Sequence, residues 1–186
     1  MRVIAGQFRS RTLRSLPGMD IRPTLDRLRE TLFNVLTPGN PAALEGSTWI
    51  DLYAGTGAVG IEAISRGASM VYFVESAPDA AELIASNLRS LKVESGFQII
   101  KKDAVGAIRG LATLADFIFL DPPYRLDDEY QSTLSALAES NLLKSETIVI
   151  AEHPKKTDPG DAFSNLHRYR KLVQGDAALS FYRKGP

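Results

Sequence analysis

The tetrapeptide Asp121-Pro122-Pro123-Tyr124 directly follows an apolar run at residues 117–120. Because proline lacks a backbone N–H and fixes its own φ angle, the carbonyl of Pro122 stays outside a strand ladder and can accept a hydrogen bond. Asp121 offers a second acceptor, and Tyr124 offers a ring for stacking. Two acceptors beside an aromatic face suit a planar ring with an exocyclic amine, because they can aim the nitrogen lone pair at an electrophile. These residues therefore predict group transfer to an aromatic amine.

A glycine-rich turn lies 70 residues before this tetrapeptide, where residues 51–60 read DLYAGTGAVG. An apolar lead-in at 49–50 precedes the turn, and a helical segment at 61–66, ended by Gly67, follows it. In open α/β sheets such a strand–turn–helix unit brings the backbone and a helix N-terminus close to a nucleotide-type ligand. Dinucleotide-dependent dehydrogenases show the same G-x-G-x-x-G spacing, so the glycines alone do not identify the ligand.

Four predicted strands end in an acid or run into one, namely Asp51, Glu75, Asp103 and Asp121. Because ligands of open α/β sheets bind beyond the carboxyl ends of the strands, we expect these acids to meet in one crevice. Glu75 follows Gly55 by about 20 residues, where a carboxylate can accept hydrogen bonds from both ribose hydroxyls. Asp103 is placed to accept a hydrogen bond from an adenine amine. Asp51 either lies near the amino end of a bound amino acid or holds the loop through backbone hydrogen bonds.

Apolar runs alternate with helical segments from residue 48 onward, as expected of a doubly wound α/β sheet. Strands are predicted at 71–74, 98–101, 117–120 and 147–151, and helices at 78–91 and 127–139. Continuous apolar runs are typical of parallel strands that are buried on both faces. Ser76 and Asp79 predict a capping box for the first of these helices. The segments 168–173 and 178–184 flank a Gln-Gly-Asp turn and predict a closing antiparallel hairpin.

The first 40 residues differ from the rest of the chain in pattern and charge. Segments 2–6 and 12–16 predict a β-hairpin, and leucines at helical spacing after residue 24 predict a helix. Residues 1–30 hold seven arginines against three acids, whereas the remaining 156 residues hold 15 basic and 19 acidic side chains. Arginine favours bidentate contacts with phosphate. We therefore predict a basic RNA-binding extension at 1–40 ahead of a main domain at 41–186.

The composition excludes several other classes of protein. The chain of 186 residues has no cysteine, so it forms no disulfide and no thiolate metal site. Its two histidines have no paired spacing, and we expect no metal. No apolar run approaches the roughly 20 residues that a membrane helix needs, and the arginine-rich start has no apolar signal core. We expect a cytoplasmic enzyme.

These motifs resemble the class I S-adenosylmethionine-dependent methyltransferases and, more closely, the RsmD family of 16S rRNA (guanine-N2)-methyltransferases. The likeness covers nearly the whole chain. It rests on RVIAG at 2–6, RPT at 22–24, R-x-RETLFN at 27–34, the glycine turn and the Asp-Pro-Pro-Tyr tetrapeptide. The family implies a Rossmann-like, mostly parallel sheet of seven strands, whose last two strands form a reversed hairpin.

The resemblance also implies an activity and roles for individual residues. S-adenosylmethionine would supply a methyl group to N2 of guanine 966 in 16S rRNA, within a small-subunit assembly particle. The cofactor would be held by Asp51, Gly55, Gly57, Glu75 and Asp103, and the base by Asp121, Pro122 and Tyr124. The rRNA backbone would contact Arg9, Arg11, Arg14 and Arg22. We expect the enzyme to act as a monomer.

Other functions fit parts of the same pattern. The tetrapeptide also suits amino methylation of DNA adenine or of a protein glutamine. The arginine-rich start argues against a protein substrate, and the absence of an added target-recognition domain argues against a sequence-specific DNA enzyme. An NAD-dependent oxidoreductase would explain the glycines and Glu75 but neither Asp51 nor the tetrapeptide. A non-catalytic RNA-binding protein would leave the acids at the strand ends without a role.

Overall fold

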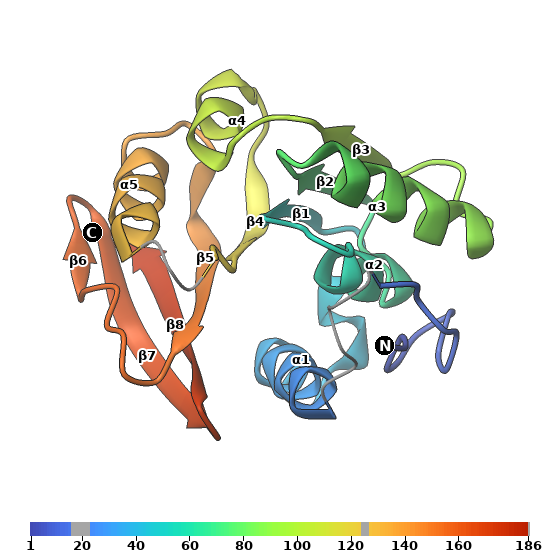
Figure 1. Cartoon of the computed structure of the whole chain (residues 1–186). Coiled ribbons are helices and arrows are strands. Elements are labelled where there is room, and N and C mark those ends of the chain that lie inside the picture. Colours follow the sequence, from blue (N-terminus) through green and yellow to red (C-terminus); the bar gives the residue numbers. More distant parts are fainter. Residues whose placement is uncertain (16–22, 124–126, 186) are drawn as a thin grey trace.

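A computed structural model describes residues 1–15, 23–123 and 127–185 (Figure 1). The helices are α1 (Pro23–Leu36), α2 (Ala58–Ser65), α3 (Pro78–Ser90), α4 (Ala104–Gly110) and α5 (Asp127–Ala138), with a 3-10 turn η1 (Pro41–Leu44). The strands are β1 (Thr48–Leu52), β2 (Met70–Val74), β3 (Phe97–Ile100), β4 (Ala115–Leu120), β5 (Leu143–Pro154), β6 (Ala162–Phe163), β7 (Leu166–Gln174) and β8 (Ala177–Lys184). Among the described helices, none combines the length and apolar character needed to cross a membrane.

The strands form one sheet in the order β3-β2-β1-β4-β5-β8-β7-β6. The five strands from β3 to β5 are parallel, and β8 and β7 close the sheet as an antiparallel hairpin. This confirms the predicted α/β sheet, and the two-residue strand β6 adds an edge that was not predicted. From β1 the chain moves outward to β3, and from β4 it moves outward in the other direction. The crevice between the ends of β1 and β4 is therefore the switch point where ligands of such sheets bind.

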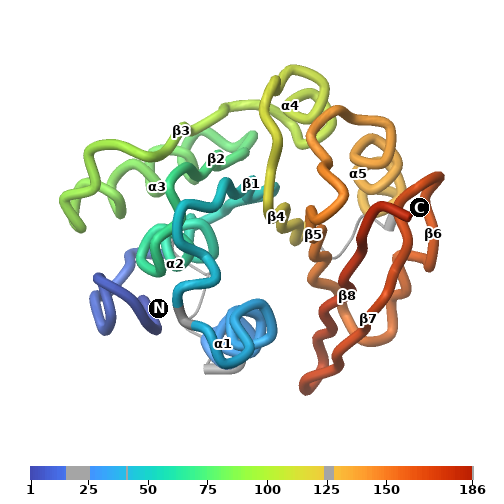
Figure 2. Tube along the Cα trace, turned by 180° about the vertical axis from the view of Figure 1, so that it is seen from behind, coloured from blue at the N-terminus to red at the C-terminus, as the bar shows by residue number. Residues whose placement is uncertain are grey.

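Helices cover both faces of the sheet, as Figures 1 and 2 show from opposite sides. Helices α1, α2 and α3 contribute to one apolar core, and α4 and α5 contribute to the other. Trp49 of β1 is fully buried in the first core, where its ring stacks on Phe33 of α1 at 5.3 Å and on Phe117 of β4 at 4.8 Å between centroids. These contacts hold α1 against the centre of the parallel sheet.

The N-terminal segment folds back on itself but forms less β-structure than predicted. Arg2 and Thr12 make an isolated antiparallel bridge, and the Val3 N–H donates to the Arg11 carbonyl at 2.9 Å. The predicted return segment extends to residue 16, which lies outside the described residues. Val3 and Leu13 are buried in the same core as α1, while the division of the chain at residue 40 stays a prediction.

The N-terminal segment forms little β-structure because its backbone hydrogen-bonds to helix α2 instead. The N–H groups of Ile4 and Ala5 donate to the two carboxylate oxygens of Glu62, at 2.7 and 2.9 Å. Gly6 has a φ of +79°, and a Cβ atom there would lie 1.8 Å from the Ser65 carbonyl oxygen. Only glycine fits this approach. The Ala-Gly pair of the RVIAG block thus seats the N-terminal segment on α2.

Helices α3 and α4 differ from the prediction. The N-cap of α3 is Ala77, and no side chain caps this helix, so the capping box predicted from Ser76 and Asp79 is wrong. Helix α4 was not predicted, because its seven residues include two glycines, which are poor helix formers. Its start is fixed instead by Asp103, whose side chain accepts a hydrogen bond from the Gly106 N–H at 2.7 Å.

Candidate active site

The glycine turn joins the end of β1 to α2, and its three glycines meet different surroundings. Gly57 is the N-cap of α2 with a φ of +77°. A Cβ atom on Gly55 would point into open space, with the Tyr53 carbonyl oxygen at 3.9 Å as its nearest neighbour. A Cβ atom on Gly60 would lie 2.3 Å from the Phe73 ring. Gly55 therefore leaves the backbone open to a ligand, while Gly60 lets α2 pack closely on β2.

Glu75, at the end of β2, connects this turn to the start of α3. Its Oε2 accepts a hydrogen bond from the Gly55 N–H at 2.9 Å, and its Oε1 accepts one from the Ala77 N–H at 2.8 Å. This second bond takes the place of the predicted capping box. Each carboxylate oxygen has two lone pairs, so Glu75 can still accept hydrogen bonds from a ligand.

A cavity of about 180 Å³ lies beyond the carboxyl ends of the central strands. Its lining includes Glu75 and Asp103, which sequence reasoning predicted, and Pro123 of the Asp-Pro-Pro-Tyr tetrapeptide. The other lining residues are Tyr53, Val74, Ser76, Lys102, Ala104 and Glu129. The fold thus brings the predicted adenosine-binding acids and Pro123 to one hollow.

Asp51 lies deeper, at the end of β1, and is 2% exposed. Its Oδ2 accepts a hydrogen bond from the Gly60 N–H at 2.9 Å, which fits the predicted role of holding the loop. Burial, helped by the negative charges of Asp121 and Glu75, raises the pKa of Asp51 to about 8. Burial also raises the pKa of Asp121. A positively charged ligand in this crevice would favour the ionised forms of these carboxyls.

Replacing Asp51 by Asn is expected to change how stability depends on pH. The pKa of Asp51 is about 8 in the folded chain and near 3.8 in the unfolded chain. Between these values the folded chain keeps a proton that the unfolded chain has lost, so the free energy of unfolding falls as the pH rises. Asp51→Asn keeps an acceptor for the Gly60 N–H but removes this titration. Urea unfolding at two pH values near the ends of this window should show a smaller fall in the free energy of unfolding for Asp51→Asn than for the parent chain. Equal falls would contradict the raised pKa of the buried Asp51 carboxyl.

Tyr53 is a residue of the site that sequence reasoning missed. Its φ of +60° is unusual for a residue with a side chain, and it turns the ring toward α5. The Tyr53 hydroxyl donates to Glu129 Oε2 at 2.8 Å and lies 2.7 Å from Thr133 Oγ1. Tyr53 therefore ties the glycine turn to the helix that follows the tetrapeptide. Its position inside the 51–60 motif is the signal that could have found it.

The remaining predicted residues fall into three groups. Asp121 and Pro122 directly follow β4, next to the glycine turn that follows β1. Tyr124 and Arg22 lie outside the described residues. The N-terminal segment carries three exposed arginines: Arg9, Arg11 and Arg14.

The N-terminal segment is attached to both the glycine turn and helix α3. Asn87 of α3 accepts a hydrogen bond from the Arg14 N–H and donates to the carbonyl oxygens of Arg14 and Thr56, at 2.9, 3.2 and 3.0 Å. The guanidinium groups lie along α3, where Arg11 donates to the Ser90 carbonyl and Arg14 to the Ser86 hydroxyl, both at 3.3 Å. A buried asparagine therefore links the basic segment to the site.

Residues 1–183 match the family described as Conserved hypothetical protein 95. Ribosomal RNA small subunit methyltransferase D of Escherichia coli is 29% identical, over 99% of this chain and 90% of its own. YlbH of Bacillus subtilis is 33% identical, over 99% of both chains. Among solved structures, yhhF of Escherichia coli superposes with a TM-score of 0.84 at 28% identity, covering 100% of this chain and 98% of its own.

The sheet order, the glycine turn and the strand-end acids define a Rossmann-like methyltransferase. The family match over almost the whole length then identifies the family within this class. It belongs to the RsmD family of methyltransferases. Among the residues that the structure describes, no cluster of three or more histidine, aspartate or glutamate side chains is arranged to hold a metal ion.

Proposed function

We propose that the chain methylates small-subunit rRNA, transferring the methyl group of S-adenosylmethionine to the exocyclic N2 of a guanine. The main support for this proposal is that Glu75, Asp103 and Pro123 line one cavity. This arrangement supports an adenosine-type site beside a tetrapeptide suited to hold an aromatic amine. The relatives named ribosomal RNA small subunit methyltransferase D support rRNA as the substrate. Guanine 966 comes from the family resemblance alone.

The residues present fit this cofactor. Gly55 leaves the open backbone that the methionine part needs, and Glu75 lines the cavity with acceptors for ribose hydroxyls. Asp103 lines the same cavity and would accept a hydrogen bond from the adenine amine. The buried carboxyl of Asp51 lies just below the glycine turn, and a bound cation there would favour its ionised form. When bound, S-adenosylmethionine supplies an electrophilic methyl group on a positively charged sulfur.

The chain itself would position the acceptor nitrogen. The amine of guanine is a poor nucleophile, because its lone pair is delocalised into the ring. Hydrogen bonds to the Asp121 carboxylate and the Pro122 carbonyl would draw this nitrogen out of the ring plane and direct its lone pair at the methyl carbon. Tyr124 would stack on the base. The raised pKa of Asp121 equips its carboxylate to take the proton that the amine sheds after transfer.

A base within an rRNA helix must leave its stack before it can reach these residues, which costs a few kcal/mol. The N-terminal segment, with Arg9, Arg11 and Arg14, is the proposed anchor that offsets this cost through phosphate contacts. Replacing these three arginines together by Ala should weaken RNA binding and flatten its dependence on salt. An unchanged salt slope in anisotropy titrations would place the RNA surface elsewhere.

Methyl transfer to small-subunit particles tests the proposed function. Particles from cells that lack the family's methyltransferase, incubated with the protein and radiolabelled S-adenosylmethionine, should gain one labelled N2-methylguanine at position 966. Nuclease digestion and mapping by mass spectrometry would locate it. Label at an adenine, at another guanine or in ribosomal protein would contradict the proposal.

Ligand-induced stabilisation separates the methyltransferase from a dehydrogenase. S-adenosylhomocysteine at 100 times its dissociation constant should raise the free energy of unfolding by about 2.7 kcal/mol. NAD at the same concentration should leave the melting temperature unchanged. The reverse result, with NAD alone stabilising the protein, would favour an oxidoreductase.

A further inference from the structure

The outer strands β7 and β8 carry five basic residues and no aspartate or glutamate. Arg168 and Lys171 form ion pairs with Asp158, and Arg168 also pairs with Asp161. The other three basic residues are Arg170, Arg183 and Lys184. Within the described residues, no carboxylate lies at ion-pair distance from these three. This end of the sheet therefore presents positive charge to its surroundings.

An aromatic residue lies among these cations because β7 is irregular. The register of β7 against β8 shifts between Arg168 and Arg170, at a β-bulge that contains Tyr169. The Tyr169 side chain is 47% exposed, and the Arg183 guanidinium lies 4.6 Å from its ring centroid. Arg170 lies over the Phe181 ring, whose centroid is 6.3 Å from that of Tyr169.

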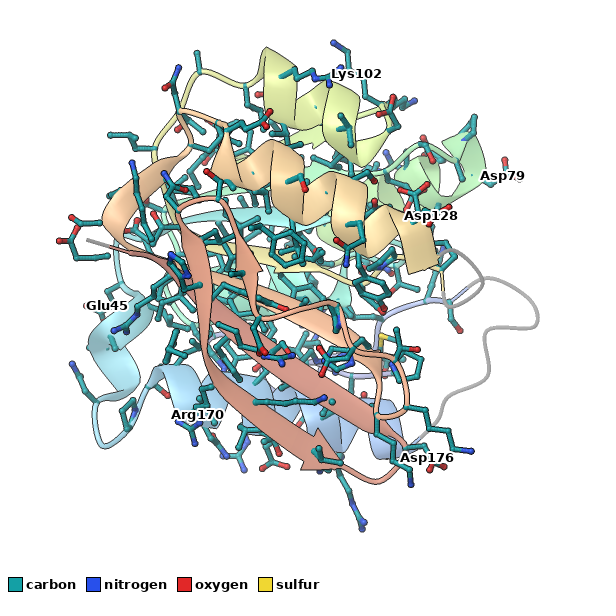
Figure 3. The ribbon with its side chains drawn as sticks, turned by 90° about the vertical axis from the view of Figure 1, so that its left-hand side faces the viewer. Glu45, Asp79, Lys102, Asp128, Arg170 and Asp176 are labelled. Carbon is teal, nitrogen blue, oxygen red and sulfur yellow. The ribbon has the colours of Figure 1, made fainter. Side chains whose placement is uncertain are left out.

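These side chains share the face of the sheet on which α1 packs. Phe181 belongs to the core beneath α1, and Arg183 follows it by two residues in the same strand. Figure 3 shows Arg170 on this side of the sheet, whereas Asp128 of α5 lies across it. We name Tyr169, Arg170 and Arg183 the β7–β8 platform. The N-terminal segment lies beyond the other side of α1 (Figure 1).

We propose that the β7–β8 platform is a second RNA-binding surface, which stacks an unpaired base on Tyr169 and contacts the neighbouring phosphates through Arg170 and Arg183. Single-stranded RNA is bound by aromatic rings and guanidinium planes that stack on bases, with cations along the backbone. The platform supplies both within one exposed surface. This inference rests on the proposed function, because it takes the RNA substrate as the occupant.

Protection of the sheet edge does not account for this arrangement. Exposed edge strands commonly carry lysine and arginine, which prevent pairing with other chains. Charge alone would serve that purpose, and an exposed aromatic ring would work against it. The bulge at Tyr169 instead presents the ring together with two guanidinium groups, which is the combination that RNA stacking uses.

The position of the platform lets one RNA contact both it and the candidate site. Tyr182 pairs with Val149, and Leu120 at the end of β4 pairs with Ala151, so Arg183 lies only a few residues along β5 from the level of the site. Strand β7 is the third strand from β4, which corresponds to about 14 Å across the sheet. A short segment of RNA can therefore reach both.

Binding measurements without cofactor test the platform. We would titrate a fluorescein-labelled fragment of small-subunit rRNA with the protein at several salt concentrations. The double variant Arg170→Ala/Arg183→Ala should lower the slope of log affinity against log salt by about 1 to 2. Tyr169→Ala should weaken binding about fivefold or more, and Tyr169→Phe should bind like the parent chain.

Arg109→Ala is the matched control, because it removes an exposed arginine from α4 on the opposite face. It should leave both affinity and slope unchanged, and all variants should keep the melting temperature of the parent chain. Parent-like RNA binding by the platform variants would overturn the inference. So would self-association of these variants at unchanged RNA affinity, because that result would assign the charges to edge protection.

The experiments distinguish an error in the platform proposal from an error in the proposed function. The binding assay contains no methyl donor, so it reports on the platform whatever reaction the site catalyses. If the platform is wrong but the proposed function is right, platform variants methylate rRNA particles normally and bind RNA normally. If the proposed function is wrong, the parent chain itself transfers no methyl group to the particles.

Discussion

Asp121→Ala should abolish methyl transfer while leaving cofactor binding intact. Asp121 directly follows β4, where its carboxylate would accept a hydrogen bond from the guanine amine, whereas the proposed cofactor contacts come from Gly55, Glu75 and Asp103. Removing one preorganised hydrogen-bonding group at a reacting centre costs about two to three orders of magnitude in rate. Loss of the proton acceptor should add to this. Single-turnover transfer to rRNA particles would measure the rate, and calorimetry with S-adenosylhomocysteine would measure cofactor binding.

A second acid on the same strand provides the control. Asp116 lies at the opposite end of β4, where it accepts a hydrogen bond from the Thr48 N–H and forms an ion pair with Lys144. Asp116→Asn should affect stability but not the rate of transfer. If Asp121→Ala instead lost cofactor binding together with activity, the proposed separation between base-binding and cofactor-binding residues would be wrong.

Glu62→Ala should produce the largest loss of stability. Glu62 is fully buried on α2, where its carboxylate accepts hydrogen bonds from the Ile4 and Ala5 N–H groups and from Arg66 at 2.7 Å. Arg29 of α1 lies 4.0 Å from the same carboxylate and is itself almost completely buried. Breaking a buried pair leaves an uncompensated charge and costs about 3–5 kcal/mol. Urea unfolding, followed through the fluorescence of the single tryptophan Trp49, would measure this cost.

Glu82 is a matched control, because it also pairs with an arginine, Arg89, at 2.6 Å, but both side chains are about two-thirds exposed. Glu82→Ala should leave the unfolding midpoint where it is in the parent chain. Because Glu62 attaches the N-terminal segment to α2, Glu62→Ala should also weaken RNA binding. Equal stability of the two variants would show that the N-terminal segment does not depend on this carboxylate.

The sheet could be predicted because its signals are local. Strands such as 71–74 and 117–120 are continuous apolar runs, and the acids that follow them occupy the same edge by topology. The G-x-G-x-x-G spacing and the tetrapeptide could therefore be placed at one crevice before the structure was known. The cavity lined by Glu75, Asp103 and Pro123 agrees with this placement.

The features that sequence reasoning missed depend on contacts between distant parts of the chain. Nothing near Glu62 or Asn87 shows that each side chain bonds to the backbone of a segment more than 50 residues away. The capping box failed for a local reason instead, because Glu75, two residues before Ala77, already accepts the hydrogen bond of the Ala77 N–H. Tyr53 gains its role only when α5 brings Glu129 and Thr133 to its hydroxyl.

A crystal structure of the protein with bound S-adenosylmethionine would test the central claim most directly, which is that the glycine turn and the end of β4 form one reaction centre. We expect the methionine part along Gly55 and Gly57, with the methyl carbon directed toward Asp121 and Pro122. The gap should admit an incoming nitrogen at about 3–3.5 Å from that carbon. A methyl group directed away from the end of β4, or a cofactor bound outside the glycine turn, would contradict the account.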